Sequence, residues 1–262
     1  MSSYQVIGTE VDRRGVATVT LNRPEKHNAL NPQMLDELAR VASDFAVDDD
    51  VRVVVLAGAG KTWCAGGDLD WMKAQLESDP ATRTAEARKL AVALQSINSL
   101  PKPVIAKVHG AAYGGGIGLM SVSDIVVAVE GAKFGLTETK LGLVPATIGP
   151  FVVRRMGEGF ARQVFFSGKS FGVDFALRTG LVSEKCAAND LDAAVEEYVG
   201  PALQCAPGAV AVAKSMCLAH GGESLSNFID ETVATLTQRW ASAEAQEGID
   251  AFFARRQANW IR

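Results

Sequence analysis

Two glycine-rich segments have the composition of a site that stabilises a negatively charged oxygen. Residues 63–68 read WCAGGD and residues 110–118 read GAAYGGGIG, and each segment follows shortly after an apolar, β-branched run. Small residues let backbone N–H groups approach a ligand closely, and the first N–H groups of a helix have no intrahelical acceptor. Two such donors directed at one point stabilise charge on a carbonyl oxygen. The pattern predicts an oxyanion hole, and the expected substrate group is a thioester carbonyl that becomes an enolate.

Nucleotide-binding motifs do not explain these segments. Residues 60–62, Gly-Lys-Thr, mimic the end of a P-loop, but the glycine that such a loop needs five residues earlier is Val55. Residues 114–118 do not continue into a dinucleotide fingerprint, because Leu119 and Ser121 stand where a final glycine would fall. We therefore expect neither ATP nor NAD.

The bulk composition of the 262 residues argues against several other classes of protein. The net charge of −4 is unlike that of a general nucleic-acid binder, which usually has a basic face. The sequence shows no charged-then-apolar leader and no apolar run of membrane-spanning length, so we expect a cytoplasmic protein that binds no membrane. The four cysteines share no close metal-ligand spacing, which predicts reduced thiols and no metal.

Strands and helices alternate around the two segments. The continuous apolar runs over Val53–Leu56 and Val104–Val108 predict strands buried on both faces. Asn31 followed by Pro32 predicts the start of a helix, with the asparagine side chain as its cap. The pattern also predicts strands over Tyr4–Val11, Val16–Leu21 and Ile125–Val129, and helices over Asp68–Gln75 and Thr82–Ile97.

After residue 150 the pattern is helical only, which predicts an α/β core followed by a helical extension. The expected helices cover Glu158–Phe166, Val173–Arg178, Leu191–Val199, Val210–His220 and Glu223–Arg239.

The chain resembles the crotonase (enoyl-CoA hydratase/isomerase) superfamily over nearly its whole length. The resemblance rests on residues 22–30 (NRPEKHNAL), 64–68 (CAGGD), 114–116 (GGG) and 134–138 (FGLTE), in that order. It implies a spiral of ββα units over residues 1–200 and a C-terminal helical region, residues 201–262, used in trimer formation. It also implies an acyl-CoA thioester substrate, a homotrimer or a dimer of trimers, and no separate cofactor, because coenzyme A enters as part of the substrate.

The resemblance assigns the catalytic groups. The N–H groups of Ala65 and Gly115 would be the two oxyanion donors, and Glu138 would be the acid/base carboxylate beside the substrate α and β carbons. An apolar pocket would raise the pKa of Glu138. The alternative for Glu138 is a solvated glutamate at a helix start, where the helix dipole stabilises its charge.

The resemblance also implies substrate contacts. Lys26 would contact the CoA nucleotide. Arg255 would reach the 3′-phosphate, in many relatives across a subunit boundary. The alternative for each residue is a solvated surface cation. Asp68 is a candidate substrate contact that could instead cap the following helix. The other candidate contacts are Gly67, Leu69 and Tyr113, the last through a hydroxyl that positions water.

One family feature is missing. Hydratases of the two-glutamate type carry a second glutamate two residues beyond the triple glycine, and in this chain that residue is Gly118. Bacterial hydratases of the methylglutaconyl-CoA and isohexenylglutaconyl-CoA kind look similar at this position and at Pro145-Ala146, which favours a hydratase that works with Glu138 alone on a branched acyl-CoA. A Δ3,Δ2-enoyl-CoA isomerase is the main alternative, because moving a proton over one face needs one base. A non-catalytic acyl-CoA binder is the third hypothesis.

Overall fold

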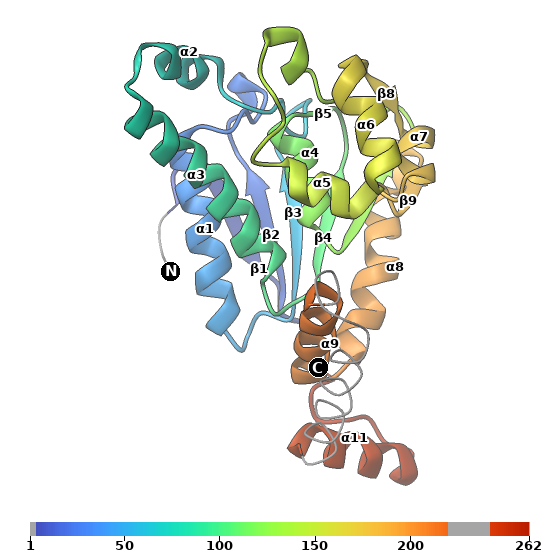
Figure 1. Ribbon diagram of the computed structural model, residues 1–262. Coiled ribbons are helices and arrows are strands. Elements are labelled where there is room, and N and C mark those ends of the chain that lie inside the picture. Colours follow the sequence, from blue (N-terminus) through green and yellow to red (C-terminus); the bar gives the residue numbers. More distant parts are fainter. Residues whose placement is uncertain (1–3, 220–241, 262) are drawn as a thin grey trace, which may run out of the picture.

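A six-stranded sheet forms the centre of the molecule in the computed structural model, which describes residues 4–219 and 242–261 (Figure 1). Its first two strands are antiparallel and all later pairs are parallel. In sheet order the strands are β1 (Ile7–Val11), β2 (Val16–Leu21), β3 (Val53–Gly58), β4 (Val104–Val108), β6 (Ile125–Val129) and β9 (Glu184–Cys186).

A second, shorter ladder lies at the carboxyl ends of these strands. It contains β5 (Ala112–Tyr113), β7 (Lys133–Gly135) and β8 (Phe171–Gly172). Two isolated bridges extend it, Cys64 with Ala112 and Leu30 with Gly67. The segment 64–67 therefore lies between Leu30 on one side and β5 on the other.

The chain repeats one unit, in which a strand of the large sheet leads into the short ladder and then into a helix. Thus β3 leads to the 64–67 bridges and α2 (Leu69–Glu77), and β4 leads to β5 and α4 (Gly115–Val122). This is the spiral of ββα units expected of the crotonase fold, and the α/β class is confirmed.

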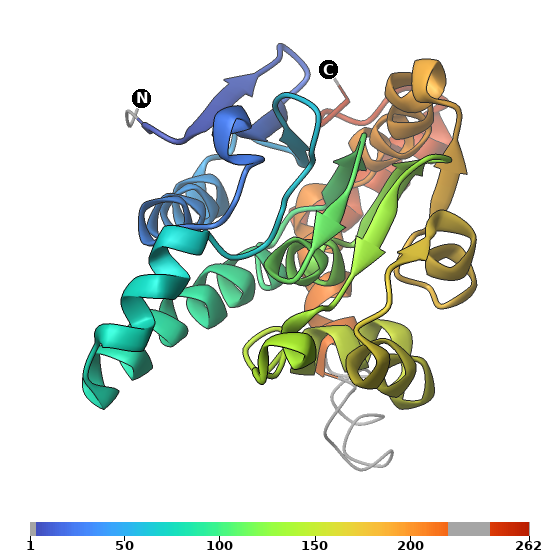
Figure 2. The same cartoon turned by 90° about the horizontal axis from the view of Figure 1, so that it is seen from above.

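Helices cover both faces of the large sheet. Figure 2 shows α1 (Pro32–Val47) and α3 (Pro80–Asn98) on one side and α8 (Leu191–Gln204) on the other. The cap predicted for α1 is present, because the Asn31 side chain accepts a hydrogen bond of 2.9 Å from the Met34 N–H. The strands β3, β4 and β6 are buried over most of their length, as their apolar runs predict.

The chain after β7 is mainly helical, but β8 and β9 also lie in it, so the expectation of helices alone after residue 150 is wrong. It contains η2 (Glu138–Leu141), α5 (Gly149–Met156), α6 (Glu158–Ser167), α7 (Val173–Arg178), η3 (Ala188–Asp190), α9 (Pro207–Ala219) and α11 (Ala243–Ala254). In Figure 1, α9 and α11 extend below the sheet, away from α2.

Two differences from the sequence predictions are informative, and one prediction cannot be compared. Strand β1 begins at Ile7 rather than Tyr4, because the N–H groups of Gln5 and Val6 donate to the buried Glu37 carboxylate instead of to a strand. The strands β5, β7 and β8 are two or three residues long, which is too short for a recognisable alternation of polar and apolar residues. The helix expected over Glu223–Arg239 lies outside the described residues.

Within the described ranges, no single helix is long and apolar enough to cross a membrane. The pair Ala188–Gln204 and Pro207–Ala219, bent by 111°, reaches that length and composition only when its two parts are taken together.

Candidate active site

The two glycine-rich segments lie side by side. The Tyr113 N–H donates to the Cys64 carbonyl at 3.0 Å, and the Cys64 N–H donates to the Ala111 carbonyl at 3.2 Å. Gly66 has φ +91°, and a Cβ atom there would lie 2.9 Å from the Tyr113 carbonyl oxygen. Only glycine combines this backbone conformation with so close an approach. The small residues at 64–67 therefore bring two distant parts of the chain together.

The second segment turns into a helix at the same place. Gly114 has φ +47°, and its N–H donates to the Gly135 carbonyl at 3.0 Å. Gly115 is the buried first residue of α4, so its N–H has no acceptor within the helix. This amide therefore supplies a donor without an intrahelical acceptor, which an oxyanion hole requires.

The first amide of the predicted oxyanion hole is not that of Ala65. The Ala65 N–H donates to the His27 carbonyl at 3.0 Å, so it is already paired. Leu30 accepts from the Asp68 N–H at 2.9 Å and donates to the Gly66 carbonyl at 2.7 Å. In a parallel bridge of this kind the intervening residue, Gly67, directs its own N–H to the opposite side. That side carries β5 and Gly115, so Gly67 is the better candidate and the assignment to Ala65 is corrected.

Glu138 lies against this junction. Its Oε1 atom is 3.1 Å from the position that a Cβ atom on Gly114 would occupy. Its Oε2 atom is buried, and none of the described residues gives it a hydrogen bond. Burial raises the pKa of Glu138, and a hydrogen bond from its own backbone opposes the shift only in part. A half-buried carboxylate with a raised pKa suits proton transfer better than the solvated glutamate that was the alternative.

No second carboxylate can enter at Gly118 without a rearrangement. A Cβ atom on Gly118 would lie 2.8 Å from Ile148 Cγ2 and 3.2 Å from Leu94 Cδ1. Both neighbours are buried, Ile148 with 2% and Leu94 with 0% of its surface exposed. The space of the missing glutamate is therefore filled by hydrocarbon.

The comparisons with known proteins agree with this geometry. Residues 12–262 match the family model described as enoyl-CoA hydratase/isomerase. The chain belongs to this family. A putative enoyl-CoA hydratase of Thermus thermophilus is 33% identical over 253 residues, covering 94% of this chain and 98% of that protein. A short-chain-enoyl-CoA hydratase of Clostridium acetobutylicum is 36% identical over 205 residues, covering 76% of each chain.

Solved structures of similar proteins share the fold closely. AtuE of Pseudomonas aeruginosa is 36% identical, with a TM-score of 0.95 over 98% of this chain and 100% of that one. An enoyl-CoA hydratase of Shewanella pealeana is 34% identical, with a TM-score of 0.93 over 98% and 96% of the two chains. These values place the chain in the enoyl-CoA hydratase/isomerase family by both sequence and structure.

Asp68, next to the Gly67 amide, holds the first segment in place. One carboxylate oxygen accepts from the Asp70 and Trp71 N–H groups at 2.9 and 3.2 Å, and the other pairs with Arg23 at 2.9 Å. Burial raises the pKa of Asp68, but the Trp71 and Arg23 hydrogen bonds outweigh it and lower the pKa below its usual value. Asp68 is thus a helix cap and an ion-pair partner, and both of its oxygens are already engaged.

Two expected contacts lie at the rim of α2. Lys26 pairs with Asp70 at 3.0 Å, with about half of its side chain exposed, and this pairing raises its pKa. Leu69 begins α2 with 79% of its surface exposed. Arg255 is exposed and follows α11, which Figure 1 shows at the end of the molecule away from α2. The structure therefore does not bring Arg255 of a chain to its own Lys26.

The Tyr113 ring lies against β7. The ring packs on Gly135, where an added Cβ atom would lie 3.0 Å from two ring carbons and 3.3 Å from the Ser170 hydroxyl oxygen. The ring therefore lies on the same side of the short ladder as the exposed Ser170. The water-positioning role predicted for Tyr113 gains no support from this placement.

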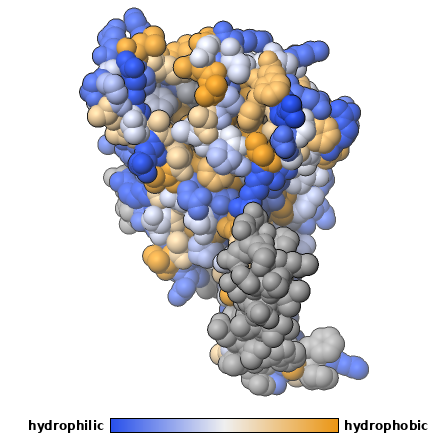
Figure 3. All heavy atoms as spheres, viewed as in Figure 1, coloured by the Kyte–Doolittle hydropathy of each residue, from blue (hydrophilic) through white to orange (hydrophobic). Residues whose placement is uncertain are grey.

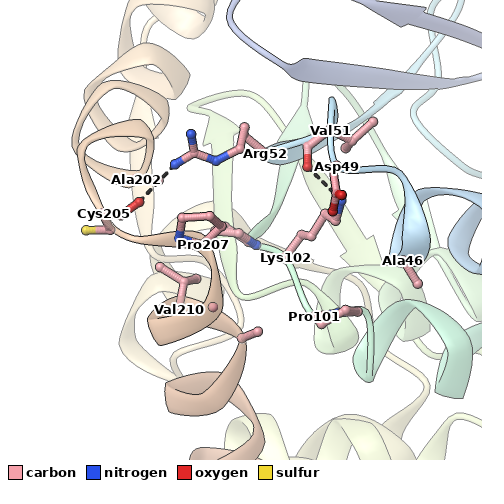
Figure 4. Close-up of a pocket in the computed structure, with 13 residues that line it drawn as sticks. Ala46, Asp49, Val51, Arg52, Pro101, Lys102, Ala202, Cys205, Pro207 and Val210 are labelled. Carbon is pink, nitrogen blue, oxygen red and sulfur yellow. Dashed lines mark hydrogen bonds between the residues drawn. The ribbon is translucent and has the colours of Figure 1, made fainter. Parts of the chain in front are cut away.

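A cavity of about 310 Å³, whose lining Figure 4 shows, includes none of these residues in its wall. It is lined by Arg52 and Lys102, which precede β3 and β4, and by the turn before α9. The Arg52 guanidinium donates to the Cys205 carbonyl at 2.8 Å, and the Lys102 ammonium donates to the Val51 carbonyl at 2.7 Å. The cavity is at the amino ends of the strands, whereas open α/β sheets bind ligands at the carboxyl ends. We place the chemistry at the glycine junction.

Proposed function

We propose that this protein is an enoyl-CoA hydratase that adds water across the 2,3-double bond of an acyl-CoA thioester, or removes it in the reverse direction. The observation that carries the proposal is Glu138, a carboxylate of raised pKa with a buried, unpartnered oxygen, beside two converging glycine segments. The hydratases among the similar proteins support the same reaction.

The Gly67 and Gly115 N–H groups bind the thioester oxygen in this proposal. As a nucleophile adds at C3, electron density moves to that oxygen and the thioester becomes an enolate. Two preorganised amides stabilise the enolate more than the neutral carbonyl, which lowers the barrier. Because both donors are backbone groups, their positions depend on the glycine conformations and on the ladder that holds them.

Glu138 moves the proton. Its carboxylate accepts a proton from water while the hydroxide adds to C3, and the resulting carboxylic acid returns that proton to C2 of the enolate. The sum is one water added and no net change in Glu138. Burial raises the pKa of Glu138 above that of a solvated glutamate and towards neutral pH, which favours both proton transfers.

The isomerase is the second candidate, and the surroundings of Gly118 favour it. With Ile148 in the place of a second carboxylate, Glu138 is the acid/base group at the junction. A single base can remove a C2 proton from a 3-enoyl thioester and return it to C4 of the dienolate. The same two amides would stabilise the dienolate.

Incubation with short 2-enoyl and 3-enoyl thioesters separates these functions. Loss of enoyl absorbance with formation of a 3-hydroxyacyl product supports the hydratase, and formation of a 2-enoyl product from the 3-enoyl thioester supports the isomerase. Binding of both thioesters without turnover would make the protein a non-catalytic acyl-CoA binder. Glu86→Gln is the matched control for Glu138→Gln, because Glu86 is already held by Trp71 and Lys89, each at 2.9 Å. A loss for Glu86→Gln as large as that for Glu138→Gln would contradict a mechanism based on Glu138 alone.

The finer assignments are part of the proposal. The resemblance at Pro145-Ala146 supports a branched, glutaconyl-type acyl group, which a panel of branched and straight 2-enoyl thioesters would test through kcat/KM. A homotrimer or dimer of trimers, in the cytoplasm, would bring Arg255 of one subunit towards the CoA site of another. Light scattering at several protein concentrations measures the assembly, and a monomer with full activity would remove Arg255 from the site.

A further inference from the structure

The side chain that fills the missing-glutamate position is rigidly held. Ile148 precedes α5, and its carbonyl accepts from the Phe151 and Val152 N–H groups, each at 3.1 Å. The atoms nearest to a Cβ on Gly118 are its Cγ2 at 2.8 Å and its own Cβ at 3.3 Å. A β-branched side chain has little freedom at these atoms, because they move only with χ1 or with the backbone. Leu94, in contrast, approaches with a terminal methyl group that can rotate away.

Ile148 packs against the catalytic turn itself. Gly118 stands one helical turn after Gly115, and its N–H donates to the Gly114 carbonyl at 3.2 Å. Glu138 approaches the same turn from the other end, with Oε1 3.1 Å from a Cβ position on Gly114. The isoleucine therefore lies within one turn of α4 from both the oxyanion amide and the catalytic carboxylate.

The nearest carboxylate on α3 does not replace the missing one. Glu86 shares a helix face with Leu90 and Leu94, since these residues are four apart. Its two oxygens are engaged by Trp71 Nε1 and Lys89 Nζ, and the Lys89 interaction lowers its pKa. A carboxylate that stays ionised and paired is a poor proton donor.

We infer that Ile148 is a specificity-determining residue. It occupies the volume that a second carboxylate at position 118 would need, and so it restricts proton transfer at the site to Glu138. The inference rests on the proposed function of Glu138. A water molecule beside C3 would then have Glu138 as its acid/base partner, facing a wall of hydrocarbon. Replacing Ile148 by alanine removes three carbon atoms, which makes room for most of a glutamate side chain at Gly118.

A double-mutant cycle of Gly118→Glu and Ile148→Ala tests this, with hydration and isomerisation rates measured for each variant. We expect Gly118→Glu alone to lose about tenfold or more in kcat/KM. Ile148→Ala should raise kcat/KM at least about tenfold in the Gly118→Glu background, and this gain should exceed the change that Ile148→Ala causes in the Gly118 background. The ratio of hydration to isomerisation should be highest in the double variant. Additive effects of the two changes would overturn the inference.

Val152→Ala is the matched control, because Val152 is as buried as Ile148 but supplies none of the three atoms nearest to a Cβ on Gly118. Restoration of Gly118→Glu by Val152→Ala would indicate general loosening of α5 and would overturn the role of Ile148. If Gly118→Glu does not fold, Gly118→Ala gives a second measurement. It should lower the melting temperature by about 3 °C or more in the wild-type background and by less beside Ile148→Ala. Equal losses in both backgrounds would overturn the inference.

The activity of the wild-type enzyme separates a failure of the proposed function from a failure of the role of Ile148. If it turns over neither 2-enoyl nor 3-enoyl thioesters, the proposed function fails. If it is active but the cycle is additive, the proposed function stands and the role of Ile148 is refuted.

Discussion

Replacing Glu138 by glutamine is the most direct perturbation of the proposed chemistry. The substitution keeps the size of the side chain and removes its ability to accept a proton. General acid–base catalysis contributes roughly 10²- to 10⁴-fold, so kcat should fall by that factor, which is about 3 to 5 kcal/mol of activation free energy. The two oxyanion donors are backbone groups and remain in place. KM should therefore stay within about tenfold of the wild-type value.

The same substitution should lower activity but raise the stability of the folded protein at pH 8. Burial raises the pKa of Glu138 above the usual 4.5, so the folded protein binds this proton more tightly than the unfolded chain does. The associated stabilisation is complete below the unfolded pKa and is lost as the pH rises through the folded value. At pH 8 the ionised carboxylate, with Oε2 buried and unpartnered, costs stability. Glutamine carries no charge, so the variant should melt about 2 to 4 °C higher for each kcal/mol relieved.

Steady-state kinetics and thermal unfolding across pH 4 to 9 together test this reasoning. The wild-type kcat/KM should have an acidic limb displaced upward from the 4.5 typical of glutamate, and the variant should lack that limb. The melting-temperature difference should shrink as the pH falls towards 4.5. A variant that keeps most of its activity, or that melts below the wild type at pH 8, would refute the assignment of Glu138 as a buried base.

Three further predictions concern the structure that holds the site. Gly66→Ala should cost about 1 to 3 kcal/mol of unfolding free energy, because Gly66 has a positive φ. Gly67→Ala should cost less than about 1 kcal/mol, because the nearest atom to its added Cβ is the flexible end of a methionine side chain at 3.3 Å. Equal losses in chemical denaturation would contradict the close approach of the loops. Burial raises the pKa of Cys64 to about 12, so mass spectrometry after alkylation at pH 8 should find it unmodified in the folded protein and modified after unfolding. Lys214→Met should destabilise the protein by about 1 to 3 kcal/mol, because the partly buried Asp124 carboxylate loses the ammonium group that pairs with it at 2.7 Å. An unchanged melting temperature would show that this pair does not anchor α9.

Exposed apolar side chains beside the site are a further feature of the surface. Leu141, Leu143 and Val144, just after Glu138, are between 49% and 68% exposed, and Phe166 on α6 is 72% exposed. Figure 3 shows apolar groups among polar ones in the upper part of the face, where these elements lie. Such groups are typical of surfaces that become buried in an assembly. The light-scattering measurement proposed above therefore also bears on this face.

Local sequence patterns were sufficient to predict much of the scaffold. The apolar runs of β3, β4 and β6 and the Asn31 cap are short-range features, so neighbouring residues alone determine them. The two glycine segments were also recognisable from their small residues, whereas Glu138 was assigned by the resemblance to the crotonase superfamily and not by a pattern of its own.

The tertiary structure decided which groups of these segments are available. Whether the Ala65 or the Gly67 amide is free depends on hydrogen bonds with His27 and Leu30, more than thirty residues earlier in the chain. The occupant of the space beside Gly118 is Ile148, thirty residues later, and no local pattern signals that contact. The physical reason is that an amide or a cavity is defined by what packs against it. Those neighbours come from parts of the chain that only the completed spiral brings together.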